Sequence, residues 1–171
     1  MTPTAPCRVL ILYDLGDLIE ALAEHIATGA QSVANTEVVL RNPRQATRDD
    51  MIAADALIIG TPNWTGIKGT LKRWLDTTGD LWEEGSLAGK VGAAFTTSAG
   101  RHSGTEFTLL NVLHWFLGNS MLIVGLPWTP QMEQSGSYYG ATAITTLTAA
   151  DQQQAYALGR RVAEIALRMR D

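Results

Sequence analysis

The sequence alternates short, nearly continuous apolar runs with longer segments whose apolar residues recur at helical spacing. The first run, residues 8–13, reads RVLILY, and it has the length and apolarity of a strand that is covered on both faces. After it the period changes, because Leu18, Leu22 and Ile26 recur at the spacing of an amphipathic helix. A chain that repeats this change of period is restricted to an architecture of alternating strands and helices.

The alternation continues along the whole chain. We expect strands at residues 8–13, 37–40, 56–60, 91–96 and 122–126, and helices at residues 18–30, after Thr47, and at residues 67–78, 105–117 and 149–170. Thr47 is expected to cap the short second helix, with Asp49 and Asp50 in its first turn. Right-handed crossovers place helices on both faces of such a sheet, and five strands favour the order 2-1-3-4-5. The sequence therefore predicts an α/β fold with a five-stranded parallel sheet, in a single domain over residues 1–171.

The composition limits the classes of function. With 171 residues, of which 46% are hydrophobic, the chain can bury a core without a disulfide, and the single Cys7 cannot form one within the chain. A net charge of -4 argues against a nucleic-acid surface that depends on phosphate contacts. We interpret the basic cluster of Lys68, Lys72 and Arg73 as a solvated helix face. Neither an apolar run of membrane-spanning length nor a secretory signal is visible, so we expect a cytoplasmic protein without a membrane partner.

In an open parallel sheet, ligands bind beyond the carboxyl ends of the strands where the strand order reverses, so the loops after strands one, three and four are the candidates. The loop after strand three, residues 60–67, reads GTPNWTGI. Its glycines allow close backbone approach, and Trp64 offers a ring face on which a planar heterocycle can stack. The alternative is an ordinary connection in which Trp64 covers the edge of the sheet.

The loop after strand four, residues 96–104, reads TTSAGRHSG. Its small residues let the backbone approach a ligand, and its hydroxyl groups can donate or accept hydrogen bonds. The alternative is a flexible polar loop that caps the next helix.

A family resemblance runs through these loops. The stretch from Gly60 to Trp82, GTPNWTGIKGTLKRWLDTTGDLW, resembles the isoalloxazine-binding segment of the tryptophan-repressor-binding-protein type of NAD(P)H:quinone oxidoreductases. The resemblance continues through GKVGAAFTTSAGRHSGTE and GSYYGAT, and so covers most of the chain from Ala56 onward. It implies a flavodoxin-like fold, FMN as the cofactor, NAD(P)H as the electron donor and a quinone-like acceptor. It also implies a homo-oligomer, a dimer or a tetramer, although the family's insertion after strand two, which contributes to oligomer contacts, is missing here.

The resemblance assigns residues to three parts of a flavin site. The first loop would meet the phosphate and the other two would embrace the ring: Asp14, Leu15, Gly16, Asp17 and Leu18; Thr61, Pro62, Asn63, Trp64, Thr65, Gly66 and Ile67; and Thr97, Ser98, Ala99, Gly100, Arg101 and His102. Trp82 falls where the family lines its quinone pocket. Hydride transfer requires no general acid or base, so we assign no catalytic side chain, and we expect no metal.

The first loop departs from the family pattern. The family's phosphate loop carries serine or threonine with a glycine, whereas no hydroxyl residue stands between Tyr13 and Thr28 here, and the loop is one residue shorter. Asp14 and Asp17 bring negative charge to the place of a phosphate, which at about 4 Å and an effective dielectric near 20 costs several kcal/mol per carboxylate. We interpret Asp17 as the N-cap of the following helix.

A second departure concerns histidine. The family has a histidine-containing pair before strand five, and Gly118 and Asn119 take these positions here. His102 is a candidate substitute, whereas His114 is interpreted as a helix residue without a chemical part. Two alternatives to an oxidoreductase therefore stay open. One is a flavodoxin-type electron carrier, which the mildly acidic composition disfavours. The other is a flavin-free binding domain.

Overall fold

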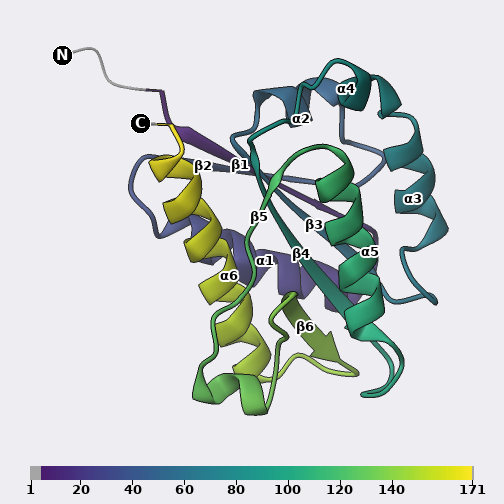
Figure 1. Ribbon diagram of the computed structural model, residues 1–171. Helices are drawn as coiled ribbons and strands as arrows, with labels where there is room; N and C mark the ends of the chain where they lie inside the picture. The colour runs from purple at the N-terminus through teal and green to yellow at the C-terminus, as the bar shows by residue number, and fades with distance from the viewer. Residues whose placement is uncertain (1–4, 171) are drawn as a thin grey trace.

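The computed structural model describes residues 5–170, and it contains one parallel sheet between two layers of helices (Figure 1). The elements are β1 (Cys7–Tyr13), α1 (Asp17–Gln31), β2 (Thr36–Arg41), α2 (Arg48–Ala53), β3 (Ala56–Pro62), α3 (Gly69–Asp76), α4 (Gly79–Glu83), β4 (Val91–Ser98), α5 (Thr105–Gly118), β5 (Leu122–Ile123), a 3-10 helix (Pro130–Glu133), β6 (Gly140–Ile144) and α6 (Ala149–Arg168). The strand order is β2-β1-β3-β4-β5, with β6 also paired to β4. The predicted α/β class, strand order and helical layers are confirmed.

The fifth strand differs from its prediction. β5 has two residues, which pair with Val91 and Gly92 at the start of β4. The chain then leaves the sheet, and β6 pairs with the second half of β4 from Ala94 to Ser98. The N–H of Val124 still donates to the carbonyl oxygen of Gly92 at 2.8 Å, but that of Leu126 donates to the carbonyl oxygen of Tyr138 at 3.2 Å, so the predicted strand leaves β4 before its end. The edge position is therefore shared by two short strands, and the second of them was not predicted.

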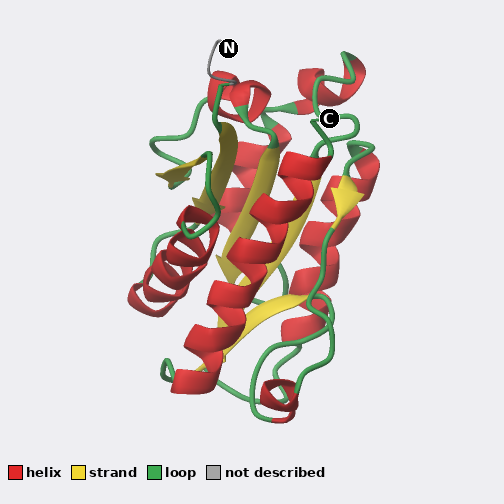
Figure 2. Cartoon of the chain, turned by 90° about the vertical axis from the view of Figure 1, so that its left-hand side faces the viewer, coloured by secondary structure: helices red, strands yellow, loops and turns green. Residues whose placement is uncertain are grey.

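Each face of the sheet has its own core, because successive side chains of a strand point to opposite faces. Val9 and Ile11 of β1 pack with α1 and α6, while Leu10 and Leu12 pack with α2, α3 and α5. Figure 2 shows the long α6 lying across one face of the sheet, the face that it shares with α1. α1 and α6 approach closely at Gly159, where an added Cβ would lie 1.9 Å from the carbonyl oxygen of Ile26.

Two helix caps were predicted from the sequence, and the structure confirms one of them. The Thr47 hydroxyl accepts the N–H of Asp50 at 3.1 Å, as predicted, and Asp50 completes a capping box. The interpretation of Asp17 as an N-cap is wrong, because Gly16 holds that position and Asp17 is the first helical residue. In the loop before the helix, it is the Asp14 carboxylate that accepts a backbone N–H, that of Leu15. No helix between residues 5 and 170 is long and apolar enough to cross a bilayer.

Candidate functional site

The carboxyl ends of β1, β3 and β4 meet at one edge of the sheet, and a cleft of about 510 Å³ opens there. Its lining residues come from α1, the last residues of β3 and β4 and the loops that follow them, and the residue after β6: Leu18, Pro62, Asn63, Trp64, Thr97, Ser98, Ala99 and Thr145. All of them except Thr145 were predicted to bind the cofactor. The cleft therefore lies where the reversal of strand order predicts it.

Asn63 joins the two loops that form the sides of the cleft. Its Nδ2 donates to the carbonyl oxygen of Ser103 at 2.7 Å, in the loop after β4. Its Oδ1 accepts the N–H of Gly66 at 3.3 Å and the hydroxyl of Thr108 at 3.0 Å. The backbone N–H of Asn63 also donates to the carbonyl oxygen of Thr97 at 2.7 Å. One side chain thus fixes its own loop, the opposite loop and α5 relative to one another.

The predicted hydroxyl residue Thr61 supports the cleft from beneath. Thr61 is fully buried, and its Oγ accepts the backbone N–H of Lys68 at 3.1 Å. The hydroxyl of Thr96 donates to the carbonyl oxygen of Thr61 at 2.6 Å. Thr65 turns the loop in the left-handed region with a φ of 57°, which is uncommon for a residue other than glycine. These contacts hold the loop in a tight turn that presents Trp64, whose side chain is 70% exposed.

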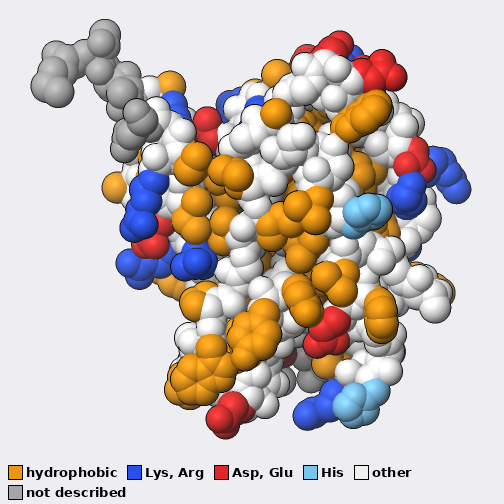
Figure 3. Space-filling view, viewed as in Figure 1, with side chains coloured by type: hydrophobic (Ala, Val, Ile, Leu, Met, Phe, Trp, Pro, Cys, Tyr) orange, Lys and Arg blue, Asp and Glu red, His pale blue; other side chains and the backbone are white. Residues whose placement is uncertain are grey.

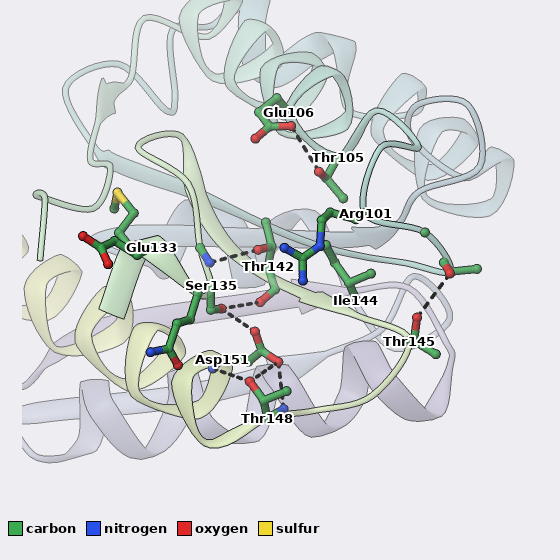
Figure 4. A pocket seen from close by; sticks show the side chains of 15 residues that line it. Arg101, Thr105, Glu106, Glu133, Ser135, Thr142, Ile144, Thr145, Thr148 and Asp151 are labelled. Atoms are coloured by element: carbon green, nitrogen blue, oxygen red, sulfur yellow. Dashed lines mark hydrogen bonds between the residues drawn. The ribbon is translucent and has the colours of Figure 1, made fainter. Parts of the chain in front are cut away.

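Thr145 closes the opposite side of the cleft. Its N–H donates to the carbonyl oxygen of Ser98 at 2.8 Å, and its hydroxyl donates to the carbonyl oxygen of Ala99 at 3.2 Å (Figure 4). The Ser98 hydroxyl donates to the carbonyl oxygen of Gly100 at 2.8 Å. Sequence reasoning missed Thr145 because its position depends on β6, and the residues quoted for the family resemblance ended three positions earlier.

The loop after β1 adjoins the cleft, and we call it the phosphate end: Leu18 lines the cleft, whereas Asp14, Leu15, Gly16 and Asp17, which were predicted for the same site, do not. An added Cβ at Gly16 would lie 3.8 Å from the side chain of Pro62 in the cleft wall. Asp14 is buried, its Oδ1 accepts the N–H of Leu15 at 2.8 Å, and its Oδ2 has no hydrogen-bond partner. Lys68 Nζ lies 3.5 Å from Asp14 Oδ1 and donates to the carbonyl oxygen of Leu15 at 3.2 Å. Lys68 therefore belongs to this loop rather than to a solvated helix face. Beneath the loop, burial and then the nearby carboxylate of Glu20 raise the pKa of Tyr13.

A second cavity, of about 470 Å³, shares Ala99 and Thr145 with the cleft (Figure 4). The predicted residues Gly100 and Arg101 line it, and Arg101 extends into it. Asp151 on its floor accepts the N–H of Thr148 at 2.7 Å and the hydroxyl of Ser135. Both oxygens of this carboxylate therefore already accept hydrogen bonds from neighbouring residues. The predicted residue His102 is exposed in the neighbouring loop and lines neither cavity.

A groove of about 590 Å³ runs between α3, α4 and α5. Several predicted or candidate residues line this groove rather than the cleft: Thr65, Gly66, Ile67, Trp82, His114, Gly118 and Asn119. Its far end lies at the amino edge of the sheet, because Ser120 accepts the N–H of Gly89 at 3.0 Å just before β4 begins. Within one chain, Trp82, Gly118 and Asn119 are therefore not brought together with the cleft.

Comparison with known proteins assigns the family. The model of a family described as NADPH-dependent FMN reductase matches residues 9–129. The chain belongs to this family. A relative from Syntrophobacter fumaroxidans named NAD(P)H dehydrogenase (quinone) is 35% identical, with 94% of this chain and 97% of the relative covered. A relative of the same name from Archaeoglobus fulgidus is 44% identical over 113 residues, which cover 66% of this chain and 59% of that protein. The resemblance found in the sequence is confirmed.

Solved structures support the flavodoxin-like fold of this FMN reductase family member. A flavodoxin, WrbA-like protein from Agrobacterium tumefaciens superimposes with a TM-score of 0.78 over 95% of this chain and 99% of that one. A flavodoxin from the domain Archaea superimposes with a TM-score of 0.75. Their sequence identities of 23% and 20% make these likenesses evidence of fold alone.

FMN, the cofactor in the family's description, fits one end of the cleft better than the other. The ring end offers the Trp64 indole, the apolar Pro62 and backbone groups held in place by Asn63, as an isoalloxazine requires. The phosphate end, which adjoins the cleft at Leu18, has the buried Asp14 carboxylate with an unpartnered oxygen, and the residues from Asp14 to Leu18 include no hydroxyl. The residues therefore fit the flavin ring, and they do not fit a phosphate dianion.

Proposed function

We propose that this chain is an FMN-dependent oxidoreductase that takes hydride from NAD(P)H and passes electrons to a quinone-like acceptor. The observation that carries the proposal is the ring end of the cleft, where Asn63 joins two loops around an exposed Trp64. The relatives named NAD(P)H dehydrogenase (quinone) support the choice of donor and acceptor. Reduced nicotinamide nucleotides are made in the cytoplasm, which we propose as the place of action.

FMN, when bound, would supply the two-electron chemistry, and the protein would supply the position and the surroundings of the ring. Trp64 and Pro62 provide apolar surface against which a ring packs, and Thr97 and Ser98 provide polar edges. Asn63 acts as a positioning residue, because its polar atoms are used in contacts between loops. Arg101, in the adjoining cavity, is placed to attract the phosphates of a nicotinamide nucleotide.

A large apolar surface favours assembly with further copies. One face of the molecule carries a broad group of hydrophobic side chains over α5 and the following segments (Figure 3). The exposed large hydrophobic residues from α5 to the start of β6 are Phe107, Leu110, Leu117, Leu122, Ile123, Trp128, Tyr138 and Tyr139. Patches of this kind mark interaction sites. An electron carrier that docks on basic partners would present acids instead, so we propose a homo-oligomer and an enzyme rather than a carrier.

Assembly would also explain the position of Trp82. Its side chain is 62% exposed on α4, in the groove that ends at the amino edge of the sheet. A single chain does not bring this indole to its own cleft. We propose that Trp82 contacts an acceptor at the cleft of another copy, so that Trp82→Ala should raise the KM for a soluble quinone and leave flavin affinity unchanged.

The test is a spectroscopic and kinetic assay of the full chain. A yellow protein that NADPH or NADH bleaches without oxygen, and that a soluble benzoquinone reoxidises, would support the proposal. A yellow protein that neither nucleotide reduces would favour a carrier. A colourless protein that does not quench the fluorescence of added flavin would contradict the proposed function.

A further inference from the structure

The loop after β1 places more negative than positive charge where a flavin phosphate would lie. Asp14 is buried at the carboxyl end of β1, where its N–H donates to the carbonyl oxygen of Gly60 at 3.1 Å. Asp17 and Glu20 stand in the first turn of α1. Lys68 is the cation that reaches this loop. Lys68 pairs with Asp14 alone, and the exposed Asp17 and Glu20 add negative charge nearby, which makes this a poor site for a dianion.

The helix N-terminus does not reverse this balance. The N–H groups that begin α1 lack intrahelical partners and attract anions, and the N–H of Glu20 is the first to bond within the helix, to Gly16 at 3.0 Å. The N–H of Leu15 is already taken by the Asp14 carboxylate. The acidic side chains of the first turn meet the helix dipole themselves, so a phosphate would have to compete with them.

Lys68 is engaged as well. Its ammonium group is shared between Asp14 Oδ1 at 3.5 Å and the carbonyl oxygen of Leu15 at 3.2 Å. A phosphate that recruited Lys68 would leave the buried Asp14 carboxylate without its counter-charge, which is costly.

The charge of Asp14 indicates what the phosphate end can accept. Asp14 Oδ2 is buried and no donor bonds to it, so its negative charge acts on a nearby ligand through space. It repels a phosphate dianion and does not repel an uncharged hydroxyl chain. An uncharged ribityl chain is therefore compatible with this loop, and its phosphorylated form is disfavoured.

We infer that Asp14 makes this cleft select the flavin by its ring and not by its phosphate, so that riboflavin binds at least as tightly as FMN. The inference rests on the proposed function, because it concerns the same cleft. The cofactors that the chain accepts would then include flavins without a phosphate. Asp14 and Lys68 would be the residues that determine this specificity.

The first experiment needs no mutation. The flavin-free full chain is titrated with FMN and with riboflavin, and fluorescence quenching gives both Kd values at about 20 mM and about 200 mM salt. We expect a riboflavin Kd equal to or lower than the FMN Kd. Salt should tighten FMN binding about two- to threefold, because it screens repulsion, and should leave riboflavin binding unchanged.

Variants then assign the effect. Asp14→Asn should tighten FMN about tenfold, Lys68→Met should weaken FMN by a similar factor, and both should change riboflavin less than about threefold. Asp49→Asn is the matched control, since it removes an equal charge from the first turn of α2, near the opposite edge of the sheet. It should alter neither Kd.

The outcomes separate this inference from the proposed function. An FMN Kd at least about tenfold below that of riboflavin, or FMN binding that salt weakens, would overturn the inference and leave the oxidoreductase standing. FMN affinity that Asp14→Asn does not improve, in a variant with wild-type circular dichroism, would overturn the role of Asp14. Failure of both flavins to bind would overturn the inference and the proposed function together.

Discussion

The two ends of the cleft lie at the same edge of the sheet, yet they are organised in opposite ways. At the ring end, Asn63 uses its amide oxygen and nitrogen in hydrogen bonds that join two loops and α5. At the phosphate end, Asp14 is buried with one oxygen unpartnered and a single ammonium group nearby. The ring end is thus fixed by satisfied amide groups, while the phosphate end carries more negative than positive charge and one carboxylate oxygen without a donor.

This difference indicates which part of a ligand each end can recognise. A network of satisfied hydrogen bonds holds a shape, so it recognises a rigid ring regardless of what the ring carries. A buried carboxylate recognises charge, so it separates flavins that differ by a phosphate. Changes at the ring end should therefore affect all flavins alike, and changes at the phosphate end should affect FMN alone.

The largest effect is expected at Asn63. Asn63→Ala removes the bond to Ser103 and leaves the Thr108 hydroxyl and the Gly66 N–H without their acceptor. We expect both FMN and riboflavin to bind at least about 30-fold more weakly, and the free energy of unfolding to fall by about 1–3 kcal/mol. Flavin titration and urea denaturation measure the two effects.

Asn111→Ala provides the control for this prediction. The Asn111 amide is exposed on α5 and donates within its own helix, to Phe107 at 2.8 Å, so its removal should change flavin affinity less than threefold. Equal losses in the two variants would show that Asn63 has no special part in joining the loops.

The next effect concerns the indole at the mouth of the cleft. Trp64 is 70% exposed, so Trp64→Ala should leave stability within about 0.5 kcal/mol and weaken FMN and riboflavin equally, by about tenfold. Trp82→Ala is the matched control, because that indole is 62% exposed and lines the groove instead. Loss of flavin affinity in the Trp82 variant alone would reverse the assignment of the two tryptophans.

The sequence was informative where the signal is local. Periodicity located the first four strands, and the residues between Pro62 and Ala99 that line the cleft followed from the rule for parallel sheets. The pairing of Lys68 with Asp14 was missed because the two lie far apart in the chain. Thr145 was missed for a similar reason, since its place depends on β6 pairing with β4. Periodicity within one segment carries no signal for such long-range pairings.

A smaller effect, on the free energy of unfolding, is expected for the Asp14 carboxylate at the phosphate end. Asp14→Asn keeps an acceptor for the Leu15 N–H and removes a buried charge whose second oxygen is unpartnered, while Lys68 remains partly exposed to water. We expect the free energy of unfolding to stay the same or to rise by up to about 1 kcal/mol. Urea denaturation at neutral pH measures it.

Asp151→Asn tests whether the unpartnered oxygen is the reason. Asp151 is also buried, but both of its oxygens accept hydrogen bonds, from Ser135 and from Thr148. An amide nitrogen in place of either oxygen would face a donor, so this variant should lose about 1–3 kcal/mol. A similar loss at Asp14 would mean that the phosphate end is as well satisfied as the ring end.

The smallest effect lies beneath the phosphate end, at Tyr13. Burial and then the carboxylate of Glu20 raise the pKa of this phenol above its usual value of 10. The folded chain therefore keeps the proton more tightly than the unfolded chain, and this part of the stability is present below pH 10 and lost as the pH rises further. Tyr13→Phe should match the wild type within about 0.5 kcal/mol at pH 7, because the bond to Glu20 is long at 3.5 Å. Above pH 10 the variant should lose less stability than the wild type in urea denaturation. If the free energy of unfolding of Tyr13→Phe and of the wild type depends on pH in the same way above pH 10, then burial and Glu20 do not raise the pKa of Tyr13.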